Sequence, residues 1–142
     1  VRRAMNTGEL IRKYRKIAGL TQKELGEACE MSEPAIRNYE LGNRTPSDAQ
    51  VVRIAKELGI APQALVPHEM EDARDALGLL FELGDQFGLT PQDDGTLRID
   101  PKAKSSKKLH AAIKAWRSVL DEVASGEMSE AEYDLWKAKF KF

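Results

Sequence analysis

The sequence predicts a mainly α-helical chain of two domains, with one small β-hairpin in the second domain. Apolar residues recur every three or four positions along most of the 142 residues, which is the spacing of amphipathic helices. Most of these segments begin at Ser or Thr and end at Gly, as helices commonly do. The exception is residues 89–100, where Asp94 and Gly95 lie between two short alternating segments and predict a hairpin.

Composition argues against several classes of protein. No apolar run approaches the roughly 20 residues of a membrane span, and no signal-peptide pattern opens the chain. The single cysteine, Cys29, excludes an internal disulfide and fits a cytoplasmic protein; we interpret it as a small core residue. His68 and His110 lie far apart without other ligands nearby, so no metal site is predicted. We also find no phosphate loop, nucleophile–histidine pair or paired carboxylates, and therefore predict neither an enzyme nor a cofactor.

Charge is unevenly distributed along the chain. Residues 1–60 contain eleven Lys or Arg and eight Asp or Glu, residues 61–100 contain two and nine, and residues 101–142 contain nine and six. The sequence pI of about 6.2 argues against a generally basic surface that binds nucleic acid. A local basic face is sufficient for phosphate contacts, because screening limits the field to about 8 Å at physiological salt.

The first two helices are predicted over residues 7–18 and from residue 22 onward. Thr7 is the expected N-cap of the first, and Gly19 ends it. Thr21 and Glu24 have the spacing of a capping box, in which the Thr21 side chain accepts from the backbone N–H of Glu24 and the Glu24 side chain accepts from the backbone N–H of Thr21. Leu20 is expected to fill the core between the two helices.

A third helix follows after a tight turn. Ser32 is the predicted N-cap, and Pro34 lies in the first turn, where a missing N–H costs nothing. Ile36 and Tyr39 form the inward face, and Gly42 suits a left-handed end.

The outer side of this third helix carries Glu33, Pro34, Arg37 and Asn38. A short helix with donors at its exposed N-terminal end suits insertion into the DNA major groove. Asn can pair with adenine and Arg with guanine, each contributing about 1–3 kcal/mol of discrimination. The same pattern, taken alone, also fits a helical hairpin with a solvated polar face.

The residues T-Q-K-E-L-G at 21–26 and S-E-P-A-I-R-N-Y-E-L-G-N-R-T-P at 32–46 closely resemble the helix-turn-helix of the Xre family. These bacterial regulators are similar to phage repressor and Cro proteins. The resemblance covers roughly residues 10–66 and implies a five-helix repressor-like DNA-binding domain at residues 1–66. It also implies an ion pair between Arg15 and Glu40.

The resemblance further implies which residues contact double-stranded DNA. Gln22 corresponds to a phosphate-binding position, the early residues of the third helix to base-reading positions, and the loop that follows to backbone contacts. The expected DNA-binding set is Gln22, Lys23, Ser32, Glu33, Pro34, Arg37, Asn38, Asn43 and Arg44.

Three features depart from the family pattern. The turn between the two central helices often carries Gly, whereas this chain has Glu30, which would cost about 1–2 kcal/mol if left-handed. Gly26 stands where Ala is usual, which keeps close packing but loosens the helix by up to about 1 kcal/mol. Glu33 and Pro34 are unusual base-reading residues, so the sequence does not specify the operator.

Two more helices complete the predicted N-terminal domain. Ser47 caps a helix whose buried stripe is Val51, Ile54, Ala55 and Leu58, and a short helix follows at Pro62–Leu65. The periodicity therefore agrees with the five helices that the resemblance implies. Pro67 marks the predicted boundary, with residues 67–142 as the second domain.

The second domain is predicted to contain three helices around the hairpin. The helix at residues 69–87 has an apolar stripe broad enough to contact two neighbours. Residues 101–108 form a basic linker that either contacts phosphate or caps the next helix. That next helix, at residues 107–125, has a coiled-coil-like seam of Leu109, Ile113, Trp116, Leu120 and Val123. Ser129 caps the last helix, with Tyr133, Trp136 and Phe140 facing inward.

We interpret residues 67–142 as a homodimerisation domain, because one helix-turn-helix contacts only a half-site. The alternative is that these helices complete a monomeric core. The leading function is sequence-specific transcriptional regulation, as a repressor by family analogy. A second hypothesis is an antitoxin-type protein that binds a partner through its C-terminal half and its own promoter through its N-terminal half. The sequence does not identify a small-molecule effector.

Overall fold

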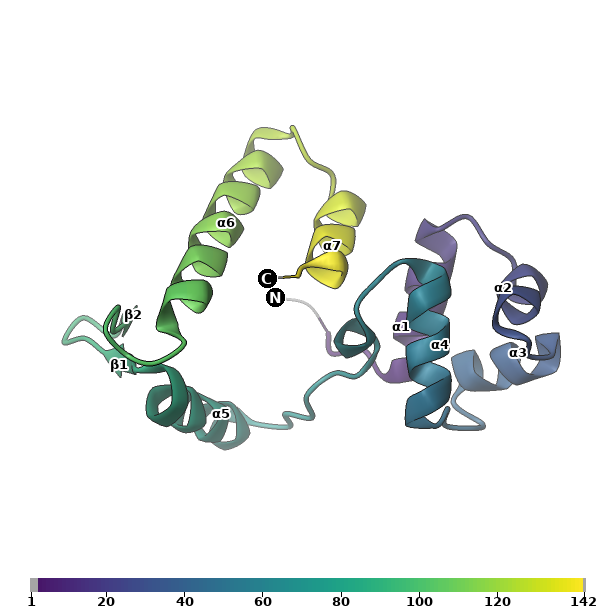
Figure 1. Ribbon diagram of the computed structural model, residues 1–142, viewed down its shortest axis with the longest axis horizontal. Helices are drawn as coiled ribbons and strands as arrows, with labels where there is room; N and C mark the ends of the chain where they lie inside the picture. The colour runs from purple at the N-terminus through teal and green to yellow at the C-terminus, as the bar shows by residue number, and fades with distance from the viewer. Residues whose placement is uncertain (1–2, 142) are drawn as a thin grey trace. The chain divides into compact units, whose positions relative to one another are not determined.

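The computed structural model describes residues 3–141, which form two compact units. The first contains the helices α1 (Thr7–Ile17), α2 (Gln22–Cys29), α3 (Glu33–Leu41), α4 (Asp48–Leu58), η1 (Pro62–Leu65) and α7 (Glu130–Lys139). The second contains α5 (Ala73–Phe87), the strands β1 (Leu89–Pro91) and β2 (Leu97–Ile99), and α6 (Ser106–Ser125) (Figure 1). The mainly helical fold class with one hairpin is therefore confirmed.

Most predicted helix caps are confirmed. Thr21 and Ser129 each form a capping box with the Glu three residues later, and Ser32 accepts a hydrogen bond from the backbone N–H of Ala35. The prediction for α1 was wrong by one residue. Asn6, in extended conformation, accepts from the N–H of Glu9 at 2.9 Å, so the short amide replaces the Thr7 hydroxyl as the cap.

The first unit has a closed hydrophobic core. Its largest fully buried side chains come from α1, α2, α3, α4 and η1, and include Ile11, Leu25, Ile36, Ile54 and Leu65. The five predicted N-terminal helices are confirmed, with the fifth forming a 3-10 helix. Cys29 is part of this core, and its burial raises the pKa of the thiol, so the side chain stays neutral and packs as a small apolar group.

The last helix, α7, packs on the N-terminal helices. Ala138 is 1% exposed and belongs to the core of the first unit, and its carbonyl accepts from the N–H of Ala61 at 2.8 Å. The Tyr14 hydroxyl donates to the carbonyl of Asp134 at 3.3 Å, and Lys13 forms an ion pair with the carboxylate of the same residue at 2.8 Å. The first unit therefore comprises the chain up to Pro67 and also Ser129–Lys141.

This arrangement differs from the predicted division, in which residues 67–142 formed one domain. The pattern of α7 identifies an inward face but not the surface that covers it, because any apolar surface can bury an amphipathic helix. Tyr133 is buried as predicted, whereas Trp136 and Phe140 are half-buried and meet edge to face with ring centroids 5.2 Å apart.

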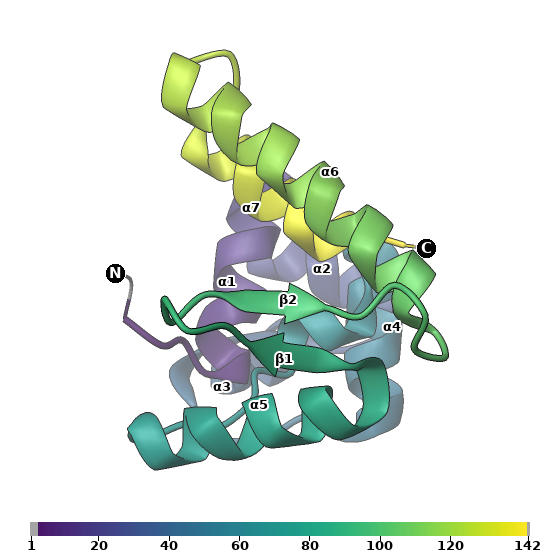
Figure 2. The same ribbon diagram turned by 90° about the vertical axis from the view of Figure 1, so that its left-hand side faces the viewer.

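The second unit is a helix, a hairpin and a helix in succession (Figure 2). The hairpin is antiparallel and pairs Leu89 with Ile99 and Pro91 with Leu97. α5 begins at Ala73, four residues later than predicted, because Asp72 accepts from the N–H of Asp75 and caps it there. α6 has no side-chain cap within the described chain, so the predicted capping role of the linker is wrong.

The core of the second unit is small. Of residues 68–128, all of which the structure describes, only Ile99, Ser106 and Val119 are buried. The hydroxyl of Ser106 is buried without a hydrogen-bond partner among the described residues. None of the predicted seam residues of α6 is buried, while the neighbouring Val119 is: Ile113 and Trp116 are exposed, and Leu109, Leu120 and Val123 are half-buried.

Two further observations apply to residues 3–141 alone. None of the helices found there combines the length and the apolarity needed to cross a bilayer. The same residues contain no cluster of three or more His, Cys, Asp or Glu side chains arranged to bind a metal ion.

Candidate nucleic-acid interface

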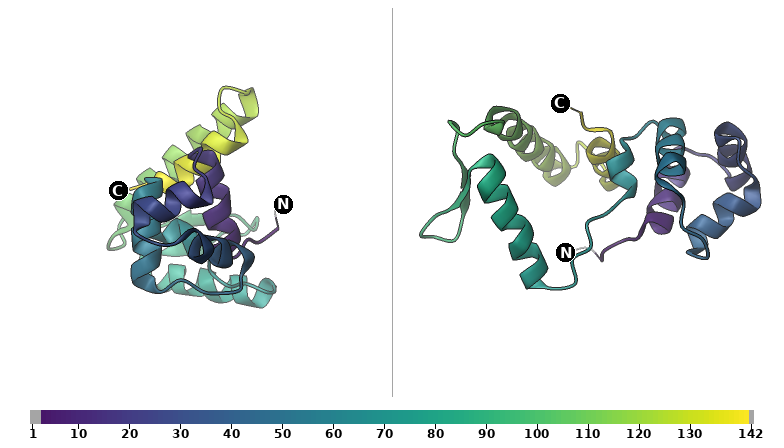
Figure 3. Two further views of the ribbon diagram at one scale, coloured as in Figure 1. Left: turned by 90° about the vertical axis from the view of Figure 1, so that its right-hand side faces the viewer. Right: turned by 60° about the horizontal axis from the view of Figure 1, so that its bottom comes forward.

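The candidate site is built on α2 and α3, which pack against each other across a short turn (Figure 3). Glu30 ends α2 in the left-handed conformation, with φ 57° and ψ 39°. A residue other than glycine costs about 1–2 kcal/mol in this conformation. The backbone N–H of Glu30 in return donates to carbonyls of the last turn of α2. The turn thus contains a left-handed residue that is not glycine.

Gly26 sets the close approach of α2 to the start of α3. A Cβ atom at this position would lie 2.8 Å from the carbonyl oxygen of Met31 and 3.3 Å from the backbone of Ser32. Both neighbours are backbone atoms, which cannot move aside as a flexible side chain can. The absence of a side chain at Gly26 therefore determines how closely the turn folds back.

α3 presents a polar outer face. Ser32 caps the helix, and Pro34 occupies its first turn as predicted. Ile36 and Tyr39 are buried, which leaves Glu33, Pro34 and Arg37 exposed and Asn38 half-buried. The described chain therefore leaves the N-terminal half of this outer face uncovered.

Leu41 was not among the predicted site residues, although it lies four positions after Arg37 on the same side of the helix. Its exposed fraction is 65%, which is the highest of any large apolar residue within residues 3–141. Helical spacing from Pro34 and Arg37 is the signal that would have identified it. An exposed leucine at this position offers an apolar surface beside the polar donors.

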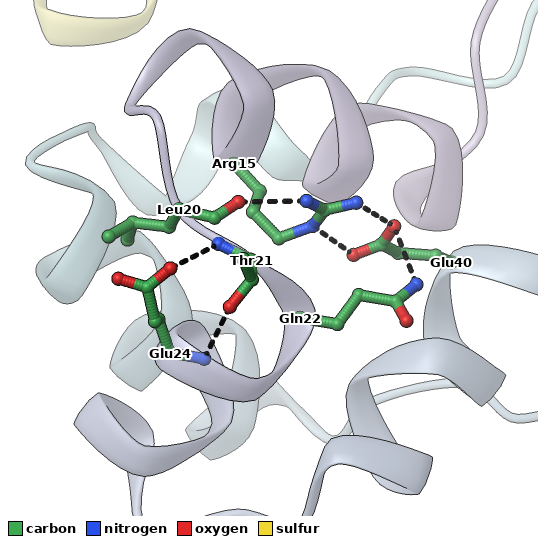
Figure 4. Close-up of polar contacts among 6 residues, drawn as sticks. All are labelled: Arg15, Leu20, Thr21, Gln22, Glu24 and Glu40. Atoms are coloured by element: carbon green, nitrogen blue, oxygen red, sulfur yellow. Dashed lines mark hydrogen bonds and ion pairs between the residues drawn. The ribbon is translucent and has the colours of Figure 1, made fainter.

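A buried ion pair fixes the end of α3 to α1. The guanidinium of Arg15 donates from Nε to one carboxylate oxygen of Glu40 at 2.7 Å and from Nη2 to the other at 2.8 Å (Figure 4). Its Nη1 donates to the carbonyl of Leu20 at 2.8 Å. The hydrogen bonds to Glu40 raise the pKa of Arg15 above its ordinary value despite burial, which opposes the shift. The ion pair implied by the family resemblance is confirmed.

Gln22 joins the same network at the start of α2. Its side-chain nitrogen donates to Glu40 at 3.2 Å. Because an amide nitrogen carries two hydrogens, this bond orients the side chain and leaves a second donor for an anion. The next residue, Lys23, is exposed in the first turn of α2, where the helix dipole also favours negative charge.

The loop after α3 is tied back to the helix. The backbone N–H groups of Asn43 and Arg44 both donate to the carbonyl of Asn38, at 3.0 and 3.3 Å. The Asn43 side chain donates to the Asn38 amide oxygen at 3.4 Å, and the Arg44 guanidinium lies 5.7 Å from the centre of the Tyr39 ring. These contacts hold an exposed asparagine and an exposed arginine beside α3.

Seven of the nine predicted residues are exposed, and Gln22 and Asn38 are half-buried. The exposed residues include three positive charges, on Lys23, Arg37 and Arg44, and one negative charge, on Glu33. Some of the nine also hold the local structure: Ser32 caps α3, Gln22 bonds to Glu40, and Asn38 bonds to Asn43. Whether any of the nine contacts DNA stays a prediction.

Comparison with known proteins identifies the family. A family model described as "Helix-turn-helix" matches residues 11–65. The chain is 37% identical over 62 residues to the uncharacterized HTH-type transcriptional regulator YazB of Bacillus subtilis (strain 168), covering 44% of this chain and 90% of that protein. A solved structure of the P22 c2 repressor protein in complex with synthetic operator 9T in the presence of Tl+ is 27% identical and aligns with a TM-score of 0.44, covering 46% of this chain and all of that one. The chain belongs to the Xre-type family of helix-turn-helix transcriptional regulators.

Proposed function

We propose that this helix-turn-helix regulator binds a specific duplex sequence by inserting α3 into the major groove, and that it represses transcription as a homodimer. The observation that carries the proposal is the outer face of α3, which is exposed while the inward face of the same helix is buried in the hydrophobic core of the first unit. A helix of nine residues with a polar N-terminal half has the size and chemistry that the major groove admits.

Bases are read, in this proposal, by side chains along the outer face of α3. Arg37 is exposed and can donate to both acceptors of guanine, and Glu33 can accept from the amino group of cytosine. Leu41 offers apolar contact to a thymine methyl group. Asn38 can pair with adenine, but it is half-buried and its amide oxygen already accepts the long 3.4 Å bond from Asn43, so we assign it a weaker reading role than Arg37.

Phosphate contacts come from the residues around that helix. Lys23 and the second donor of Gln22 lie at the start of α2, and Asn43 and Arg44 lie in the loop after α3. Such contacts fix the register of a protein on the duplex without carrying sequence information. Because Glu40 orients Gln22, the network of Arg15 links this phosphate position to the end of α3.

Dimerisation is proposed through the second unit. Of the ten large hydrophobic residues that are exposed within residues 3–141, seven lie there: Met70, Leu77, Leu80, Phe81, Leu97, Ile113 and Trp116. None of the fifteen residues of α5, all of them described, is buried. A unit with so little core gains stability by covering this surface with a second copy. Two copies then present two α3 helices to half-sites about 34 Å apart.

Selection of bound sequences from random duplex DNA tests the reading face. The unmodified chain is expected to select a palindromic sequence, and Arg37→Ala is expected to lose about 1–3 kcal/mol of discrimination at one position of each half-site. Lys56→Ala is the control, because Lys56 is an exposed basic residue on α4, outside the proposed interface. Identical selected sequences for the unmodified chain and Arg37→Ala would contradict the assignment of α3 as the reading helix.

A further inference from the structure

A second basic surface lies outside the helix-turn-helix unit. Residues 101–120 contain five lysines and one arginine and not a single Asp or Glu. They follow the most acidic part of the chain, since residues 61–100 contain nine acidic and two basic residues. We call Lys102, Lys104, Lys107, Lys108 and Lys114 the lysine segment.

The lysine segment is open to solvent and its charges are not neutralised within the structure. All five side chains belong to exposed residues, and within residues 3–141 none of them takes part in an ion pair. The nearby Arg117 differs, because it pairs with Asp121 at 2.7 Å. A run of like charges raises the energy of the free chain, and binding of a polyanion relieves that repulsion.

The geometry of the segment suits an extended anion. Four of the lysines line one surface hollow together with Pro101, Ala103 and Ser105. The fifth, Lys114, lies seven residues after Lys107 on the same side of α6, about 10 Å further along the helix axis. The seam residues Ile113 and Trp116 lie on another side of α6, so the basic and apolar surfaces of this helix are separate.

We infer that the lysine segment is a second, sequence-independent contact to the phosphate backbone of duplex DNA. This inference rests on the proposed function, because the DNA is the duplex that α3 reads. Lysine is a flexible point charge, and the segment contains none of the Arg, Asn or Gln side chains that read bases through two hydrogen bonds. It therefore adds affinity and salt dependence without adding sequence preference.

The test compares two triple variants of the full chain that lose equal charge. Lys104, Lys107 and Lys108 are changed to Gln in the first, and Lys56, Lys139 and Lys141, all exposed, in the second. Affinity for a duplex carrying the selected operator and for an unrelated duplex is measured between 50 and 200 mM salt. For the first variant, the slope of log K against log salt becomes less negative by up to about 2.7, or about 0.9 for each phosphate that is no longer neutralised. The second variant keeps the slope of the unmodified chain.

Equal slopes for the two variants would overturn the inference while leaving the proposed function standing. Failure of the unmodified chain to bind any duplex would overturn both. Vesicles containing phosphatidylglycerol test the other polyanion: if the first variant loses vesicle binding but keeps the DNA slope, the segment contacts lipid and the inference is wrong. The inference is supported if the first variant has a reduced slope on both duplexes and still prefers the selected operator over the unrelated duplex as strongly as the unmodified chain does.

Discussion

Gly26 shows how one missing side chain can determine the geometry of a proposed DNA-binding surface. The carbonyl oxygen of Met31 lies 2.8 Å from where the Cβ of any other residue would be, so α2 and the start of α3 approach more closely than an alanine permits. Because Ser32 begins α3 directly after this contact, the position of α3, the proposed reading helix, depends on it.

Gly26→Ala is therefore expected to destabilise the chain by about 1–3 kcal/mol, although alanine is the better helix former, because the added methyl group overlaps backbone. Denaturant unfolding measures the change. Gly78→Ala is the matched control: Gly78 lies within α5, and its Cβ would meet only the flexible end of Arg74 at 3.4 Å. This control is expected to be neutral or stabilising by up to about 1 kcal/mol. Equal stability of the two variants would show that the turn can relax.

The Arg15–Glu40 pair has a different role at the same scale. It joins α1 to the end of α3 and also receives the side chain of Gln22, so three helices meet at one carboxylate. Both Glu40 oxygens accept from the guanidinium, and such bidentate pairs fix orientation better than a single bond does. The pair therefore positions a proposed phosphate contact without itself reaching the surface.

At the scale of elements, α7 makes the first unit discontinuous in sequence. It follows a segment of some sixty residues that belongs to the other unit, yet it fills the core between α1 and η1. The carboxylate of Asp134 forms ion pairs with the ammonium groups of Lys13 on α1, at 2.8 Å, and of Lys137 on α7 itself, at 3.4 Å. The pair with Lys13 therefore adds to the apolar burial that holds α7 in place. The helix-turn-helix unit consequently depends on the far end of the chain.

Ala138→Asp tests this dependence. A carboxylate at a position that is 1% exposed has no partner for its charge, so we expect a loss of more than about 3 kcal/mol in stability, with weaker DNA binding following from it. Lys139→Asp, one residue later and exposed, is the control and should retain the unfolding midpoint within a few degrees. Thermal unfolding followed together with duplex binding measures both. An N-terminal unit that unfolds at the same temperature in both variants would mean that α7 is dispensable.

At the scale of the whole molecule, the two units differ in how completely they bury their apolar residues. The first has a closed core, whereas the second exposes Phe81 by 55% and Trp116 by 47%. Leu77, Leu80 and Phe81 share one side of α5, as expected of residues spaced by three and four. This difference is why we propose that the first unit binds DNA and the second binds another copy.

Phe81→Glu is expected to weaken that dimer by at least about tenfold, because a charge replaces a large aromatic side chain in a surface that must lose its water. Sedimentation at micromolar concentration should show about 32 kDa for the unmodified chain, twice its 15.9 kDa, and a shift toward monomer for the variant. Val52→Glu is the control, since Val52 is 52% exposed in the first unit. A monomeric unmodified chain that copurifies with a different protein on the second unit would instead favour the antitoxin-type alternative.

The sequence by itself determined the local features of this protein. Capping residues, apolar spacing and the Asp-Gly turn depend on neighbours within a few positions, so they predicted the helices, the hairpin and the outer face of α3, and family resemblance supplied the Arg15–Glu40 pair. Only the tertiary structure decided which surface each helix covers. It assigned α7 to the first unit, left the stripe of α5 exposed and brought Gly26 against the Met31 carbonyl. The physical reason is that an amphipathic pattern states that a face must be buried, while the partner that buries it is chosen by packing between residues far apart in the chain.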